Sequence, residues 1–158
     1  MTATPPGRAL GIDFGTKRVG YAVSDELGWV AEPLEVWIRR TLAEDLAHVG
    51  VLVASHDVVR IVFGIPFRLD GSAGPSAARA QAFLDALRAA FPAIPIEARD
   101  EALTSWEAEE RMRDRGLDQA ERKRWVDAYA AAVILQDDLD ARARANPAPP
   151  REDEDPEE

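Results

Sequence analysis

The sequence contains no cysteine, which excludes a disulfide framework and a thiolate metal site. It also has no apolar run that approaches the ~18 residues needed to span a bilayer. Residues 1–6 lack the basic and apolar regions of a signal peptide. We therefore expect a soluble, cytoplasmic protein that has no membrane partner.

Positive charge is scarce as well. Lysine and arginine number 19 against 29 acidic residues, for a formal net charge of −10, and residues 151–158 carry half of that excess. The rest of the chain is only mildly acidic, so any nucleic-acid surface must be a local patch. Composition predicts a flexible N-terminus over 1–7, one domain over 8–144 and a disordered, acidic, proline-rich tail over 145–158.

The hydrophobic pattern predicts an α/β domain. With 46% hydrophobic residues, a chain of 158 residues can bury the core of a single compact domain. A meander of strands at the start, followed by alternating helices and strands, favours a mixed sheet with crossover helices. The expected strands are 8–14, 18–24, 34–39, 58–64 and 94–99, and the expected helices are 41–55, 75–91, 104–116 and one that starts after Asp118.

The third of these strands shows apolar alternation. Leu34, Val36 and Ile38 are spaced two residues apart, with Glu35 and Trp37 between them. Because side chains alternate between the two faces of a strand, we expect the three aliphatic residues to share one face and the intervening residues to take the other.

Asp13 occupies an unusual place for an acid, inside the first strand between Ile12 and Phe14. Aspartate is depleted in strands, and removing an ionised carboxylate from water costs several kcal/mol unless something pairs with it. Glycines at 11, 15 and 20 leave little side-chain bulk nearby, so a ligand or another backbone can approach closely. A metal ion or a substrate hydroxyl would compensate the charge; the alternative is a strand-end aspartate that caps its own turn.

Two further acids lie at positions where burying a carboxylate would cost free energy. Glu101 follows the fifth strand directly, at the sheet edge where ligands gather in open α/β sheets. Asp127 shares a helix face with the small apolar residue Ala131, which predicts that it is carried towards the sheet. Glu101 could instead be a turn or helix-entry residue, and Asp127 a surface acid paired with Lys123 or Arg124.

Convergence of these three acids would imply a metal site. Three neighbouring carboxylates repel one another in the absence of a cation. Oxygen-ligating Mg²⁺ or Mn²⁺ removes that repulsion, and such ions activate water and stabilise the leaving oxygen of a phosphodiester. The sequence by itself does not show whether the three acids meet.

Four ordered blocks of the chain together resemble the YqgF/RuvX family: residues 11–25, residues 62–66 with Asp70-Gly71, residues 100–105 and residues 123–136. They span nearly all of residues 8–138. The resemblance implies a ribonuclease H-like fold, a five-stranded mixed sheet whose second strand is antiparallel to the rest, flanked by helices. Members of the family are described as Holliday-junction resolvases and as nucleases that mature the 5′ end of 16S ribosomal RNA.

The resemblance also implies site residues. It places the catalytic, metal-binding carboxylates at the same three acids, Asp13, Glu101 and Asp127. It matches basic positions that would contact phosphates in a sequence-independent way: Lys17, Arg18 and Lys123. One departure stands out, because Ala102 occupies a position where the family usually has arginine. The phosphate contact of that arginine is then missing or supplied by a neighbour such as Arg99.

The function that follows is a metal-dependent endonuclease acting on nucleic acid, either precursor 16S rRNA in ribosome biogenesis or a four-way DNA junction in recombination. Junction cutting requires two sites related by a two-fold axis, so both a monomer and a homodimer stay open.

Two other functions remain as alternatives to the nuclease. The segment Gly11 to Thr16 also resembles the first phosphate loop of actin and Hsp70 ATPases, although this chain has room for only one small domain. A non-catalytic nucleic-acid or ribosome-binding scaffold is the other.

Overall fold

The computed structural model describes residues 7–65, 74–100 and 104–145. The predicted flexible N-terminus and disordered tail therefore lie, apart from one residue each, outside the described residues. None of the described helices is long and apolar enough to cross a membrane. In chain order the elements are β1 (Arg8–Phe14), β2 (Arg18–Ser24), β3 (Ala31–Ile38), α1 (Leu42–Ser55), β4 (Val58–Ile65), α2 (Pro75–Ala90), β5 (Ile96–Asp100), α3 (Thr104–Asp114) and α4 (Gln119–Ala145).

The sheet has five strands in the order β3-β2-β1-β4-β5. Strand β2 runs antiparallel to both of its neighbours, whereas β1 pairs with β4 and β4 with β5 in parallel. Parallel neighbours need a crossover connection, and α1 and α2 supply the two crossovers. The predicted α/β fold, a five-stranded mixed sheet with an antiparallel second strand and flanking helices, is confirmed.

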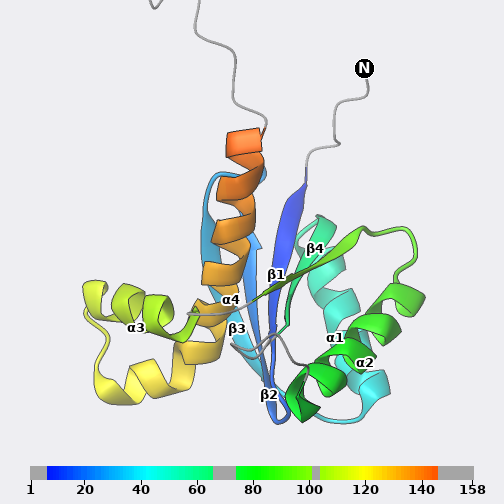
Figure 1. Cartoon of the computed structure of the whole chain (residues 1–158), viewed down its shortest axis with the longest axis horizontal. Helices are drawn as coiled ribbons and strands as arrows, with labels where there is room; N and C mark the ends of the chain where they lie inside the picture. Colours follow the sequence, from blue (N-terminus) through cyan, green and yellow to red (C-terminus); the bar gives the residue numbers. More distant parts are fainter. Residues whose placement is uncertain (1–6, 66–73, 101–103, 146–158) are drawn as a thin grey trace, which may run out of the picture.

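Helices cover both faces of the sheet (Figure 1). Helices α1 and α2 lie on one face, over a core that includes Leu10, Ile12 and Phe63. Helix α4 lies on the other face, where Ala131 and Leu135 pack against Ala9 and Val62 in β1 and β4. Helix α3 packs on the side of α4 away from the sheet. The two faces of β1 thus meet different helices, and this division decides where Asp13 points.

The prediction for the third strand was wrong in two respects. Strand β3 begins at Ala31 rather than Leu34, and the register shifts so that Leu34 has no partner in β2. Such a bulge breaks the two-residue alternation. Leu34 and Trp37 consequently pack against the same core cluster, while Ile38 is 72% exposed.

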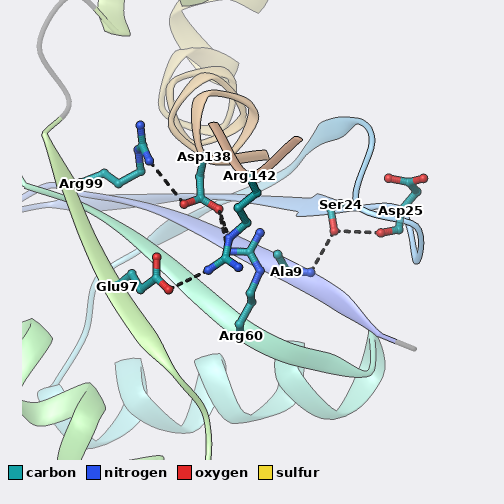
Figure 2. Close-up of polar contacts among 8 residues, drawn as sticks. All are labelled: Ala9, Ser24, Asp25, Arg60, Glu97, Arg99, Asp138 and Arg142. Carbon is teal, nitrogen blue, oxygen red and sulfur yellow. Dashed lines mark hydrogen bonds and ion pairs between the residues drawn. The ribbon is translucent and has the colours of Figure 1, made fainter. Parts of the chain in front are cut away.

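A buried carboxylate joins α4 to two strands on the same face. Asp138 is almost fully buried, and its Oδ2 lies 2.6 Å from Arg60 Nη1 in β4 and 3.1 Å from Arg142 Nε. Its Oδ1 lies 3.5 Å from Arg99 Nη1 in β5, and Arg142 Nη2 also contacts Glu97 Oε1 at 2.7 Å (Figure 2). Removing the central acid would leave three clustered guanidinium groups without their common partner.

We therefore expect Asp138→Ala to lower the free energy of unfolding by about 3 kcal/mol, because breaking a buried ion pair leaves uncompensated charge. Urea denaturation followed by far-UV circular dichroism measures the loss. The adjacent Asp137→Ala is the matched control: Asp137 is exposed, and partial desolvation together with Asp140 raises the pKa of its carboxyl. Its removal should change stability by less than about 0.5 kcal/mol. Equal losses in the two variants would contradict a structural role for the Asp138 cluster.

Candidate active site at the carboxyl end of β1

Asp13 is half-buried near the end of β1, and its partners in the two neighbouring strands are both glycine. It pairs with Gly20 in β2 and with Gly64 in β4. Residues directly opposite each other in an antiparallel pair point to the same face, so the side chain of Asp13 shares its face with the α-hydrogens of Gly20. The carboxylate therefore stands in a row of the sheet that has no side chain immediately on either side.

Helix α4 lies directly on this face. A Cβ atom added to Gly20 would lie 1.9 Å from the backbone oxygen of Asp127, and one added to Gly11 would lie 2.8 Å from that of Ala131. Gly11 is two residues before Asp13 and so shares its face, and Ala131 is one helical turn beyond Asp127. The close approach predicted at these glycines is made by the backbone of α4. It brings Asp127 to the level of Asp13 on the same side of the sheet.

The carboxylate of Asp127 has an incompletely satisfied oxygen. The side chain is 26% exposed, and its Oδ2 is buried and accepts no hydrogen bond from any described residue. Arg18 Nε lies 3.3 Å from this oxygen as an ion-pair partner. The alternative pairing of Asp127 with Lys123 or Arg124 is not the one the structure shows. A buried carboxylate oxygen without a hydrogen bond suits a hard, oxygen-ligated cation such as Mg²⁺ or Mn²⁺.

Glu101, the third predicted ligand, lies outside the described residues, as does Ala102. The residue before it, Asp100, ends β5 and pairs with Ile65 at the end of β4. Among the residues that the structure describes, no three acidic or histidine side chains come close enough together to hold a metal ion. The three-carboxylate site therefore stays a prediction that depends on Glu101.

The predicted phosphate-binding residues have different surroundings. Lys17 and Lys123 are exposed, at the β1–β2 turn and one helical turn before Asp127. Arg18 is half-exposed and turned towards Asp127, so in this structure it contacts an acid. Arg99, the possible substitute for an arginine at position 102, is directed to Asp138. Their contacts with phosphate stay predictions.

The sequence did not reveal another buried acid near the carboxyl end of β1. Asp45 in α1 is fully buried, and its Oδ1 accepts hydrogen bonds from Trp37 Nε1 at 3.0 Å and from Arg40 N at 2.9 Å. Its Oδ2 lies 3.1 Å from Arg39 Nε. Burial opposes ionisation, but these donors outweigh it and hold the pKa of Asp45 below its ordinary value. The capping-box spacing at Thr41 did not predict that Asp45 holds Arg39, because acids are common in the first turn of a helix.

Comparison with known proteins shows the family to which the chain belongs. Residues 7–141 match the sequence model of the RuvX family, described as Holliday junction resolvase. The chain belongs to the RuvX family. This confirms the resemblance, and the match covers every described strand and helix from β1 to most of α4.

Two RuvX-family relatives show how much of the chain is shared. A protein of Anaeromyxobacter dehalogenans, named "Putative pre-16S rRNA nuclease", is 48% identical over 136 residues, which cover 86% of this chain and 98% of the relative. One from Symbiobacterium thermophilum with the same name is 43% identical over 140 residues, covering 89% and 96%.

Solved structures show the fold at lower identity. Thermus thermophilus RuvC in complex with a Holliday junction substrate superposes with a TM-score of 0.58 at 21% identity, covering 86% of this chain and 95% of that one. The fowlpox virus resolvase bound to Holliday junction DNA gives 0.52 at 7% identity, covering 84% and 98%. At these identities the likeness shows that the RuvX-family chain shares their fold.

Proposed function

We propose that this protein is a metal-dependent endonuclease that hydrolyses phosphodiester bonds in precursor 16S rRNA and so acts in the cytoplasm in ribosome biogenesis. The observation that carries the proposal is the close packing of the Asp127 backbone on Gly20. Because Gly20 pairs with Asp13, this packing brings Asp127 and Asp13 to the same level on the same face of the sheet. The name carried by relatives at 43–48% identity over most of their length supports the RNA substrate.

Asp13, Asp127 and Glu101 would hold Mg²⁺ or Mn²⁺. All three are oxygen donors, the ligands that these ions prefer, and Glu101 is covalently adjacent to the last residue of β5, two strands from Asp13. When bound, such ions activate a water molecule for attack on phosphorus and stabilise the leaving oxygen. Asp13 is the central ligand in this proposal, because its partners in both flanking strands, Gly20 and Gly64, place no side chain beside its carboxylate.

The basic residues would position the phosphate. Lys17, at the β1–β2 turn, and Lys123, one helical turn before Asp127, are exposed, and their charge attracts the nucleic-acid backbone regardless of sequence. Arg18 would exchange partners, since a cation at Asp127 Oδ2 competes with its guanidinium for the same oxygen. The freed guanidinium can then donate two hydrogen bonds to a phosphate.

A Holliday junction is the second candidate substrate. The family description and the solved resolvases with this fold favour it. Cutting a four-way junction symmetrically requires two sites related by a two-fold axis, whereas trimming of rRNA requires only one. The oligomeric state of the protein therefore discriminates between the two candidates.

A cleavage panel tests the proposal. Precursor 16S rRNA, a single-stranded DNA and a synthetic four-way junction are incubated with the protein in Mg²⁺, in Mn²⁺ and in EDTA, and sedimentation velocity gives the subunit number. We expect metal-dependent cleavage of the precursor RNA near its 5′ end and none in EDTA. Metal-dependent cutting of the junction alone, by a dimer, would favour the resolvase. Absence of cleavage of every substrate would favour a non-catalytic scaffold.

A further inference from the structure

A groove opens on the other side of the strand that carries Asp13. Its volume is about 430 Å³, and it is lined by Phe14, Thr16, Arg39, Leu42, Arg79 and Phe83. Phe14 and Phe83 form its apolar floor, with ring centroids 4.7 Å apart, while Leu42 at the start of α1 is 49% exposed. No carboxylate lines it among the described residues. The groove therefore combines apolar surface with two guanidinium groups.

The groove and the candidate active site share one strand end. Asp13 and Phe14 are consecutive in β1, so their Cα atoms are about 3.8 Å apart and their side chains point to opposite faces of the sheet. Asp13 faces α4, and Phe14 belongs to the core beneath α1 and α2. A chain that passes over the carboxyl end of β1 would meet both.

Arg39 is held in the groove before any ligand arrives. Its Nε contacts the buried Asp45 carboxylate at 3.1 Å, Nη1 donates to the carbonyl oxygen of Thr16 at 3.4 Å, and its guanidinium lies 4.6 Å from the ring centroid of Phe14. Asp45 is itself fixed by Trp37 and by the backbone of residue 40. A side chain restrained from several directions loses little conformational entropy when it binds an anion.

Arg79 supplies the second cation. It is exposed on α2 and forms no ion pair with any described residue. Because Asp45 already balances Arg39, Arg79 leaves the groove with a net positive charge. A ligand that fits must therefore be anionic and must also have a flat or apolar body to cover Leu42 and the guanidinium plane of Arg39, which itself covers the buried rings of Phe14 and Phe83. A nucleotide has both parts, a phosphate for the arginines and a base for the apolar surface.

We infer that this groove binds a nucleotide of a single-stranded segment of the substrate, next to the scissile phosphate. The inference rests on the proposed function, and it specifies the substrate as one with a single-stranded stretch at the cut. A base that covers the apolar surface of the groove must be unpaired and turned out of its stack, which a single strand allows and a paired duplex does not.

Arg79→Gln tests the inference, with Arg40→Gln as its matched control. Arg40 is 67% exposed and adjacent to Arg39 in sequence, but it does not line the groove. Both changes remove one positive charge from the same region. Fluorescence anisotropy measures the affinity of the full-length protein for a labelled single-stranded RNA and for a blunt duplex, across a salt series and with Ca²⁺ in place of Mg²⁺.

We expect Arg79→Gln to weaken single-strand binding about tenfold and to reduce the magnitude of the slope of log K against log salt by about 0.7, the contribution of one phosphate contact. Arg40→Gln should leave the slope unchanged, and duplex binding should respond equally weakly to both variants. Equal effects of the two variants on the single strand, an equal loss for the duplex with Arg79→Gln, or no binding of the single strand by the wild type would each overturn the inference. Since this assay measures binding alone, failure of the nuclease proposal appears separately, as absence of cleavage in the panel.

Discussion

Asp13→Asn is expected to abolish cleavage, lowering the rate on the order of a thousandfold or more, while leaving the protein folded. Asparagine keeps the shape of the side chain but removes the negative charge that would hold the cation, and the metal accounts for several kcal/mol of transition-state stabilisation. Isothermal titration calorimetry with Mn²⁺ should show a parallel loss of binding. Circular dichroism should give the wild-type spectrum, because asparagine has the size and shape of aspartate and Asp13 is only half-buried.

The control for Asp13→Asn is Glu110→Gln. Glu110 is exposed on α3, so the substitution removes the same charge without touching the proposed site. It should retain wild-type activity and Mn²⁺ affinity. If Asp13→Asn cleaves at the wild-type rate with unchanged Mn²⁺ binding, Asp13 is not a metal ligand, and the capping of its own turn becomes the better interpretation.

Gly20→Ala is expected to damage both the fold and the activity. The added Cβ would stand 1.9 Å from the backbone oxygen of Asp127, so α4 would have to move away from β2. Overpacking of this kind costs about 3 kcal/mol, and a backbone carbonyl cannot swing aside as a flexible side chain can. Urea denaturation should show that loss. The cleavage rate should fall at temperatures where the variant is still folded, because Asp127 no longer stands level with Asp13.

Gly50→Ala is the control for Gly20→Ala and is expected to raise stability rather than lower it. Gly50 lies within α1, and a Cβ there would meet Phe91 at an ordinary distance of 3.7 Å. Alanine is favoured over glycine inside a helix by about 1 kcal/mol, so this variant should be slightly more stable than the wild type. If both alanine variants behave alike, close packing of α4 on Gly20 does not position the site.

The sequence predicted the elements better than it predicted their contacts. The hairpin of β1 and β2 and the stripe of α4 were predictable because their signals are contiguous: apolar runs, a tight turn and helical spacing. Strand β3 was misjudged because Pro33 interrupts its apolar pattern and the bulge at Leu34 shifts the alternation. Bulges depend on pairing with a neighbouring strand, which local sequence does not specify.

The candidate site, too, was predictable from the sequence only in part. Asp13 could be singled out because an acid within an apolar strand violates local preference, and the glycines around it indicated a close approach. The contact between α4 and Gly20 brings together residues that are more than a hundred positions apart in the sequence. No local sequence pattern predicts a contact of that kind. The groove at Arg39 and Arg79 had no signal either, since arginines from a strand end and a helix surface look ordinary until the fold brings them together. Glu101 lies outside the described residues, so its part in the site stays a prediction.

Consecutive residues of β1 serve the two sides of the sheet, and this has a mechanical consequence. Asp13 and Phe14 are joined by one rigid peptide unit. A ligand that displaced Phe14 would therefore also move the backbone next to Asp13, except for the part of the movement that the φ and ψ torsions on either side of the peptide unit take up. If the inferred nucleotide binds in the groove, its binding would in this way reorient the Asp13 carboxylate on the opposite face of the sheet.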